Sequence, residues 1–219
     1  MELTWLGHSC FRLRGKDATV ITDPPSPQTG YSLGRISADI ITISHQHLGH
    51  NYVKAVTGEP RVVSGPGEYE ISQILITGVQ TYHDDERGKR LGRNTAYLIT
   101  MDDVQFCHLG DLGTLLDDSA QEALAGADVV LVPVGGGNAL NAERAAEVVA
   151  QLEPSIIVPM HYATPNYRPG EVPLDPLDKF CHEMGVEMTE PLPKAVITKA
   201  SLPAETQVIL LGYRGHETR

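Results

Sequence analysis

The sequence has few cysteines, few aromatic residues and no long apolar run, and each shortage excludes a class of protein. Its three cysteines, Cys10, Cys107 and Cys181, are odd in number and form no C-x-x-C pair. This argues against a disulfide framework and for a reducing compartment. No segment approaches the ~20 apolar residues that span a bilayer, and the N-terminus shows no signal-peptide pattern. We therefore expect a cytoplasmic protein that does not enter a membrane.

Basic residues are scarce as well. The chain has 17 Lys and Arg against 28 Asp and Glu, a net charge of −11 with histidines neutral. Nucleic-acid binders usually carry a basic face, so nucleic acid is a disfavoured partner. Four basic residues do cluster, and they suit either an anionic substrate or a solvated loop of mixed charge: Arg87, Lys89, Arg90 and Arg93. We expect a small-molecule substrate, with an anionic one favoured if this cluster contacts it, and we leave a homo-oligomer open.

The 219 residues show no repeat and no linker, so we expect a single domain over 1–219. Strand patterns dominate the first half, and strands alternate with helices in the second half, which indicates an α/β fold. Asn141 is an expected N-cap, and Asp102-Asp103 an expected tight hairpin turn. The expected strands are 3–7, 11–13, 18–22, 39–43, 61–64, 68–71, 74–82, 95–100, 104–109, 128–132, 155–158 and 207–211, and the expected helices begin at 51 and cover 119–124, 141–152 and 176–184.

Seven of the nine histidines lie at the ends of strand-like runs, where a rigid scaffold presents functional groups. His45 and His47 lie on one side of an extended segment, and His50 can turn back toward them. Imidazole suits Zn²⁺, so this cluster predicts a metal site, with an exposed polar turn as the alternative. His182 and His216 are expected to be structural or solvated.

Three more strand ends carry metal-binding side chains. His83 follows the run 74–82, and taken alone it suits a ligand or a surface residue equally well. His108 and Asp111 follow 104–109, and the carboxylate of Asp111 can bridge two cations. His161 follows 155–158.

This order of H-x-H-x-x-H, then His, Asp and His, resembles the metallo-β-lactamase superfamily. More narrowly, the chain resembles a branch of predicted zinc-dependent hydrolases that includes ascorbate-6-phosphate lactonase-like proteins. Five short motifs carry the narrower resemblance, which extends from about residue 3 to about residue 180: Trp5 to Ser9, Asp23-Pro24, Gly65 to Tyr69, His108 to Asp111 and Pro159 to Tyr162.

The resemblance implies a four-layer αββα sandwich with the site on one edge, between the two sheets. It also implies Zn²⁺ as the cofactor, one or two ions, with Mn²⁺ or Fe²⁺ as alternatives. The implied ligands of the first metal are His45, His47 and His83. Those of the second are His50 and His161, and Asp111 would bridge both.

One position departs from the family pattern H-x-H-x-D-H. Gly49 stands where the family has an aspartate that binds the second metal and orients the attacking water. Either the second metal binds weakly or not at all, or another group replaces the carboxylate. Asp23 and His8 are the candidates, because both lie at strand ends within matching motifs.

The implied activity is hydrolysis of a small ester, lactone or phosphoester by a metal-activated water. Asp111 and His108 are expected to act in catalysis, His108 as an acid or oxyanion donor or as a hydrogen-bond partner of Asp111. His8 suits either of the roles given for His108, and Asp23 alternatively orients a ligating histidine. Two other functions remain open: a nuclease or phosphodiesterase of the same superfamily and, because of Gly49, a non-catalytic metal-binding protein.

Overall fold

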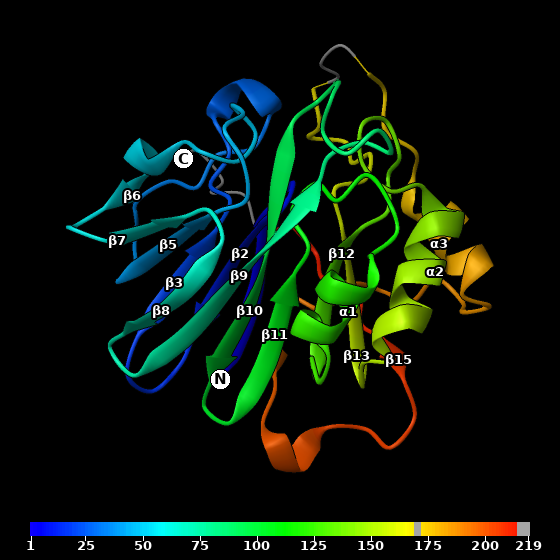
Figure 1. Cartoon of the computed structure of the whole chain (residues 1–219). Helices are drawn as coiled ribbons and strands as arrows, with labels where there is room; N and C mark the ends of the chain where they lie inside the picture. Colours follow the sequence, from blue (N-terminus) through cyan, green and yellow to red (C-terminus); the bar gives the residue numbers. More distant parts are fainter. Residues whose placement is uncertain (169–171, 214–219) are drawn as a thin grey trace.

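Two β-sheets form the body of the protein, seen in a computed structural model that describes residues 1–168 and 172–213 (Figure 1). The six-stranded sheet contains, in spatial order, β14 (Ala195–Val196), β1 (Glu2–Gly7), β2 (Cys10–Arg14), β3 (Thr19–Thr22), β5 (Ile40–Ile43) and β7 (Arg61–Ser64). The seven-stranded sheet contains β15 (Gln207–Val208), β13 (Ile156–Met160), β12 (Val129–Pro133), β11 (Val104–His108), β10 (Arg93–Met101), β9 (Ile74–Tyr82) and β8 (Gly67–Ile71). One hydrophobic core joins both sheets, which confirms the expected α/β sandwich.

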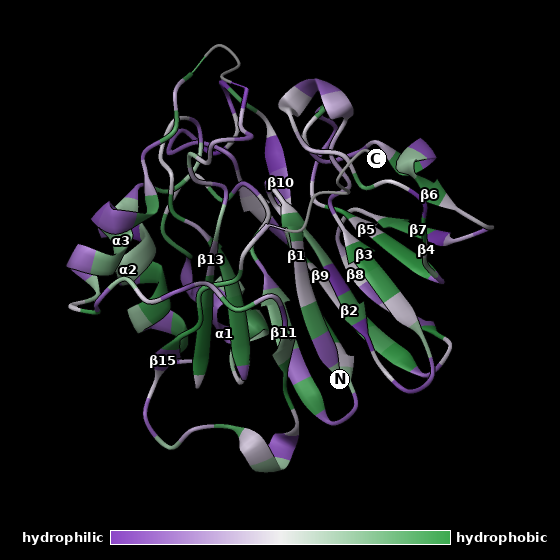
Figure 2. Ribbon diagram, turned by 180° about the vertical axis from the view of Figure 1, so that it is seen from behind, coloured by the Kyte–Doolittle hydropathy of each residue, from purple (hydrophilic) through white to green (hydrophobic). Residues whose placement is uncertain are grey.

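The second half of the chain builds the parallel part of the larger sheet. Strands β11, β12, β13 and β15 run parallel, and every residue of β12 and β13 is buried. Parallel strands need crossover connections, and here helices α1 (Asp118–Leu124) and α2 (Ala142–Leu152) supply them. Together with α3 (Leu177–Glu183) they cover the outer face of this sheet, and their hydrophilic sides turn away from it (Figures 1 and 2).

Two local predictions are confirmed. The Asn141 side chain accepts a 3.0 Å hydrogen bond from the Arg144 backbone N–H, so it caps α2. Asp102 and Asp103 both have positive φ, 50° and 63°, in the turn that joins β10 to β11. A two-residue turn of this kind matches the twist of the hairpin it closes.

The covering layer on the smaller sheet differs from the expected helical layer. Leu6, Ile21 and Ile41 pack there against Ile36 and Val56. The cover consists of a two-stranded sheet of β4 (Ile36–Ser37) and β6 (Val56–Thr57), with the 3₁₀ turn η2 (Val53–Ala55). Another 3₁₀ turn, η1 (Pro27–Thr29), follows β3.

The helix expected from residue 51 is therefore only the single turn η2, because the chain continues directly into the pairing of β6 with β4. The last strand is also shorter than expected, at Gln207–Val208, although Leu211 forms an isolated bridge with Leu192. A further 3₁₀ turn, η3 (Lys199–Ser201), precedes it. Within the described part of the chain, no helix is long and apolar enough to cross a membrane.

Candidate metal centre

The strand-end histidines converge on one carboxylate. Asp111 Oδ2 lies 3.0 Å from His50 Nε2, 3.6 Å from His83 Nε2 and 3.9 Å from His45 Nε2, and Asp111 Oδ1 lies 3.4 Å from His161 Nε2. These five residues follow four different strands: β5, β9, β11 and β13. The sandwich therefore brings together side chains that are far apart in the sequence.

The donor set fits a divalent cation. The Nε2 atom of His45 is buried and has no hydrogen-bond partner among the described residues, which is costly for a polar atom unless a ligand satisfies it. Imidazole nitrogen and carboxylate oxygen suit Zn²⁺, Mn²⁺ and Fe²⁺. Three groups have ligand atoms within 4.8 Å of one another: His45, His83 and Asp111; His45, His47 and His50; and His8, His50 and His161.

His47 is the exposed member of the cluster. Its Nδ1 accepts a 3.3 Å hydrogen bond from the backbone N–H of Gly49. Nδ1 is therefore unprotonated and faces the turn that carries Gly49. The exposure of His47 places it at the solvent side of the site, while His50 behind it is fully buried.

Asp23 orients two of the histidines. Its Oδ2 accepts hydrogen bonds from His50 Nδ1 at 2.8 Å and from the Ser44 hydroxyl at 2.5 Å, and its Oδ1 accepts from the Ser44 backbone N–H at 2.8 Å. The Ser44 oxygen in turn lies 3.0 Å from His45 Nδ1. Protons on the two Nδ1 atoms leave both Nε2 lone pairs directed at the cluster, as in a carboxylate–histidine–metal arrangement.

Asn94 and Ser9 hold Asp111 itself. The Asn94 side chain accepts a 3.0 Å bond from the Asp111 backbone N–H, and the Ser9 hydroxyl donates to Asp111 Oδ1 at 3.4 Å. His108 is buried and bonds through Nε2 to the Ser9 carbonyl at 2.8 Å. No hydrogen bond joins His108 to Asp111 among the described residues, so His108 reaches the cluster only through the turn between β1 and β2.

A third carboxylate organises the loop that follows His83. The Asp84 side chain accepts hydrogen bonds from four backbone N–H groups, at 2.7–3.0 Å: those of Glu86, Gly88, Arg90 and Leu91. Burial alone would raise the pKa of Asp84, but these four bonds lower it below its usual value. This role of Asp84 was not predicted from the sequence. A carboxylate followed by a glycine-containing polar loop was the only signal of it.

Burial sets the charge state of most of the cluster. It lowers the pKa of His45 to about 3, and it also lowers the pKa values of His8 and His161. Burial acts in the same direction on His50, but Asp111 and Asp23 outweigh it and raise that pKa to about 10. Asp111 and Asp23 thus favour the protonated form of His50, whereas burial favours the neutral forms of His8, His45 and His161.

The glycine loop Gly135 to Gly137 contacts the backbone of His161 through Gly135. The Gly135 N–H donates to the His161 carbonyl at 3.1 Å, and a Cβ on Gly135 would lie 2.2 Å from that oxygen. Residue 135 must therefore lack a side chain for the backbone of the loop to lie this close to the backbone that carries His161. His182 is exposed on α3, as expected for a solvated residue, and His216 lies outside the described residues.

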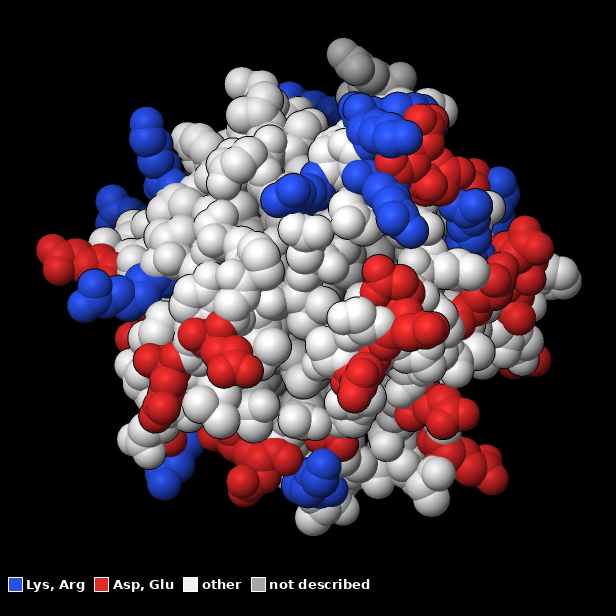
Figure 3. All heavy atoms as spheres, in the orientation of Figure 1, with Lys and Arg blue, Asp and Glu red and all other residues white. Residues whose placement is uncertain are grey.

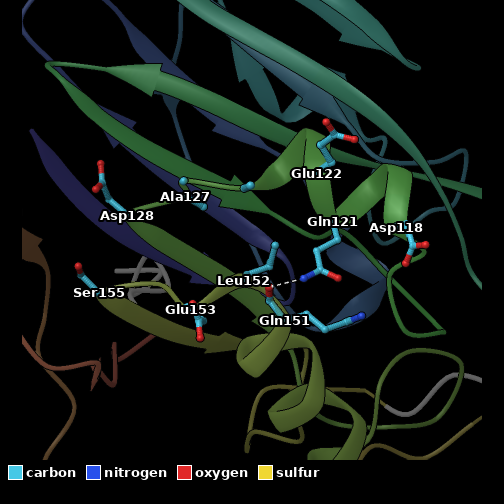
Figure 4. A pocket seen from close by; sticks show the side chains of 11 residues that line it. Asp118, Gln121, Glu122, Ala127, Asp128, Gln151, Leu152, Glu153 and Ser155 are labelled. Carbon is cyan, nitrogen blue, oxygen red and sulfur yellow. Dashed lines mark hydrogen bonds between the residues drawn. The ribbon is translucent and has the colours of Figure 1, made fainter.

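A separate hollow lies at the opposite edge of the larger sheet (Figure 4). It is lined by Ala127, Asp128 and Ser155, which directly precede β12 and β13, whereas His161 follows the carboxyl end of β13. Asp118, Glu122 and Glu153 make this hollow acidic, and it contains none of the clustered histidines.

Comparison with known proteins identifies relatives across most of the chain. Residues 2–161 match the family described as "Beta-lactamase superfamily domain". A "UPF0173 metal-dependent hydrolase" from Methanoculleus marisnigri is 30% identical over 75% of this chain and 82% of its own length. One from Methanopyrus kandleri is 25% identical over 86% and 94%. The crystal structure of a proposed Zn-dependent hydrolase of the metallo-β-lactamase superfamily from Thermotoga maritima has 32% identity and a TM-score of 0.77, covering 96% of this chain and 97% of that one.

Proposed function

The chain belongs to the metallo-β-lactamase superfamily and, within it, to the UPF0173 metal-dependent hydrolases, and on that basis we propose that it hydrolyses a small ester, lactone or phosphoester with a bound divalent cation. The observation that carries the proposal is the set of four imidazole nitrogens 3.0–3.9 Å from the Asp111 carboxylate. Fold stability alone does not account for four imidazoles around one buried carboxylate, whereas imidazole and carboxylate together are the ligands of many metal sites.

We assign the ligands as the resemblance to the metallo-β-lactamase superfamily implies. His45, His47 and His83 would hold a first cation, His50 and His161 a second, and Asp111 would bridge the two. Zn²⁺ is our first choice, because borderline imidazole donors dominate, and Mn²⁺ and Fe²⁺ are the alternatives. When bound, such a cation polarises the substrate oxygen and lowers the pKa of water.

The other residues would orient these ligands. Asp23 fixes the ring of His50 directly and that of His45 through Ser44. His108 anchors Ser9, whose hydroxyl contacts Asp111. We therefore propose positioning roles for Asp23 and His108, because no hydrogen bond or ion pair joins His108 to the clustered side chains within the described chain.

Charge near the site favours an anionic substrate. Arg87, Lys89 and Arg90 are exposed on the loop that follows His83, and at the upper right of Figure 3 Lys and Arg side chains lie close together, with Asp and Glu side chains among them. Arg168, exposed on the loop after His161, adds a further cation. The net charge of the chain is −11, so a local basic group stands out against the rest of the surface. The likeness to ascorbate-6-phosphate lactonase-like proteins makes a phosphorylated lactone the first substrate to test.

We also propose a cytoplasmic location. Cys10, Cys107 and Cys181 are all buried free thiols, as a reducing compartment would keep them.

The proposal is tested by assaying chelator-treated protein before and after addition of Zn²⁺, Mn²⁺ or Fe²⁺. The substrates are lactones, their phosphorylated forms, p-nitrophenyl esters and bis-p-nitrophenyl phosphate. We expect turnover that requires metal and that is lost in Asp111→Asn. Turnover of the phosphodiester alone would favour the nuclease alternative. A complete lack of turnover with all three metals would contradict the proposal and favour a non-catalytic metal-binding protein.

A further inference from the structure

The space that a side chain at position 49 would occupy is filled by His8, from the turn between β1 and β2. A Cβ built on Gly49 would lie 2.6 Å from Nε2 and 2.9 Å from Cδ2 of His8. The backbone of Gly49 does not have the positive φ that requires glycine. The ring of His8, and not the backbone conformation, therefore limits what residue 49 can be.

His8 stands about where a carboxylate oxygen would be if residue 49 were aspartate. Within an aspartate, the carboxylate oxygens lie two bonds beyond Cβ, at a distance close to that between the built Cβ and His8 Nε2. The ring of His8 is buried and packs against two other histidines, with centroids 4.3 Å from that of His161 and 4.9 Å from that of His50. One ring nitrogen from each of these three residues lies within 4.8 Å of the others.

The turn between β1 and β2 is built to hold His8 in this place. The register of the two strands shifts between Trp5 and Gly7, and His8 itself has a positive φ of 53°. Its carbonyl accepts two hydrogen bonds, at 3.0 Å from Trp5 Nε1 and at 3.1 Å from the His161 backbone N–H. Irregular strands and positive φ at a non-glycine residue are costly, and they persist where they aim a functional side chain.

We propose that His8 is a metal ligand in place of the missing carboxylate at position 49, so that His8, His50 and His161 form a three-imidazole second site beside Asp111. This inference rests on the proposed metal-dependent function. It replaces a charged oxygen ligand by a neutral nitrogen, which shifts the preference of the site toward metals that favour imidazole, such as Zn²⁺, and away from Mn²⁺.

The test is a titration of chelator-treated protein with Zn²⁺, with stoichiometry and affinities as the readout. We expect two equivalents per wild-type chain. In His8→Gly, where glycine tolerates the positive φ, the second equivalent should weaken by more than about 100-fold while the first is unchanged. Adding Gly49→Asp to His8→Gly should recover at least about tenfold of this loss, since the space is now free for a carboxylate. When His8 is present, Gly49→Asp alone should not increase the affinity for the second Zn²⁺ equivalent.

Two controls match these changes. His182→Ala removes an exposed histidine, and Gly212→Asp adds a carboxylate at a glycine that, like Gly49, has no positive φ and whose Cβ position has no heavy atom closer than 3.6 Å. Should His8→Gly fail to fold, the ring ¹⁵N resonances of His8 in the wild-type chain answer the same question, because they must shift as the second Zn²⁺ equivalent binds.

Three results would overturn the inference: a single equivalent in the wild type, unchanged affinities in His8→Gly, or no recovery on adding Asp at position 49. Failure of the hydrolase proposal is distinguishable from these. A protein that binds two equivalents in the expected manner but turns over no substrate refutes the activity and leaves the ligand assignment intact.

Discussion

The Asp23 carboxylate accepts a 2.8 Å hydrogen bond from His50 Nδ1, and both side chains are completely buried. This contact joins the end of β3 to the turn after β5, and it fixes which nitrogen of His50 carries the proton. Because Nδ1 is bonded to Asp23, Nε2 is the nitrogen that faces Asp111, 3.0 Å from its Oδ2, and it is the one available to a cation. The tautomer of a ligating histidine is set in this way by the partner of its other nitrogen.

Asp23→Asn should weaken metal binding without unfolding the chain. Asparagine tolerates the positive φ of 38° at this position, but its amide can offer a donor where His50 needs an acceptor. The ring then loses its preference for the ligating tautomer, and we expect metal affinity to fall by about 10–100-fold. Titration of chelator-treated protein measures this, with Asp17→Asn, an exposed change, as the control. Unchanged affinity would show that Asp23 does not orient the ligands.

His47→Ala should lose the first metal equivalent and hydrolysis together. His47 is exposed, so its removal leaves no cavity, and the free energy of unfolding of the chelator-treated protein should be nearly unchanged. Elemental analysis and the hydrolysis assay check this on the same preparation. His182→Ala is the matched control, because it also removes an exposed histidine. A fully active His47→Ala protein would mean that the first site is assigned wrongly.

Asp84→Asn should loosen the loop 84–92 in a pH-dependent way. The folded-state pKa of Asp84 is lowered, so its contribution to stability is fully present above the unfolded-state value of about 3.9 and is lost as the pH falls through the folded-state pKa. We expect faster proteolytic cleavage of this loop in Asp84→Asn than in wild type at pH 7, and a difference that shrinks below about pH 4. Asp85→Asn changes the exposed neighbour and should cleave like wild type. Equal cleavage of all three would refute the role of Asp84.

Gly110→Ala should lower the free energy of unfolding by more than the cost of placing a non-glycine residue at a positive φ. Gly110 has φ 60°, and a Cβ there would lie 2.4 Å from Asn94 Oδ1 and 2.5 Å from Ser44 Cβ. Gly58→Ala isolates the cost of the backbone, because Gly58 has φ 95° with open space around it. We expect a loss of about 1–2 kcal/mol for Gly58→Ala and about 1–3 kcal/mol more for Gly110→Ala from the overlap. Urea unfolding gives both values, and equal losses would contradict the close packing.

The sequence was sufficient to predict which strand ends carry the cluster. The β-branched run before His45 and the apolar runs before His83 and His161 predicted strands, and the structure has β5, β9 and β13 there. The carboxyl ends of neighbouring strands meet at one edge of a sheet, so proximity of their side chains followed. That two sheets face each other was implied only by the resemblance to the superfamily, which the family match supports.

Other features depend on packing between distant segments and leave no local signal. The contact of His8 with Gly49 is an example, because it depends on a register shift in the β1–β2 hairpin. The bond from His108 to Ser9 is another, since residues on two sheets must first come together. The turn η2 replaced an expected helix because strand pairing of the next two residues outweighed local propensity.

The central claim is that the carboxylate of Asp111 and the imidazoles around it hold metal, and anomalous X-ray diffraction from crystals grown with Zn²⁺ tests it most directly. We expect a zinc peak bounded by His45, His83 and Asp111 and a second bounded by His8, His50 and His161. If crystals grown with Zn²⁺ show clear electron density for these side chains but no anomalous peak among them, the claim is contradicted.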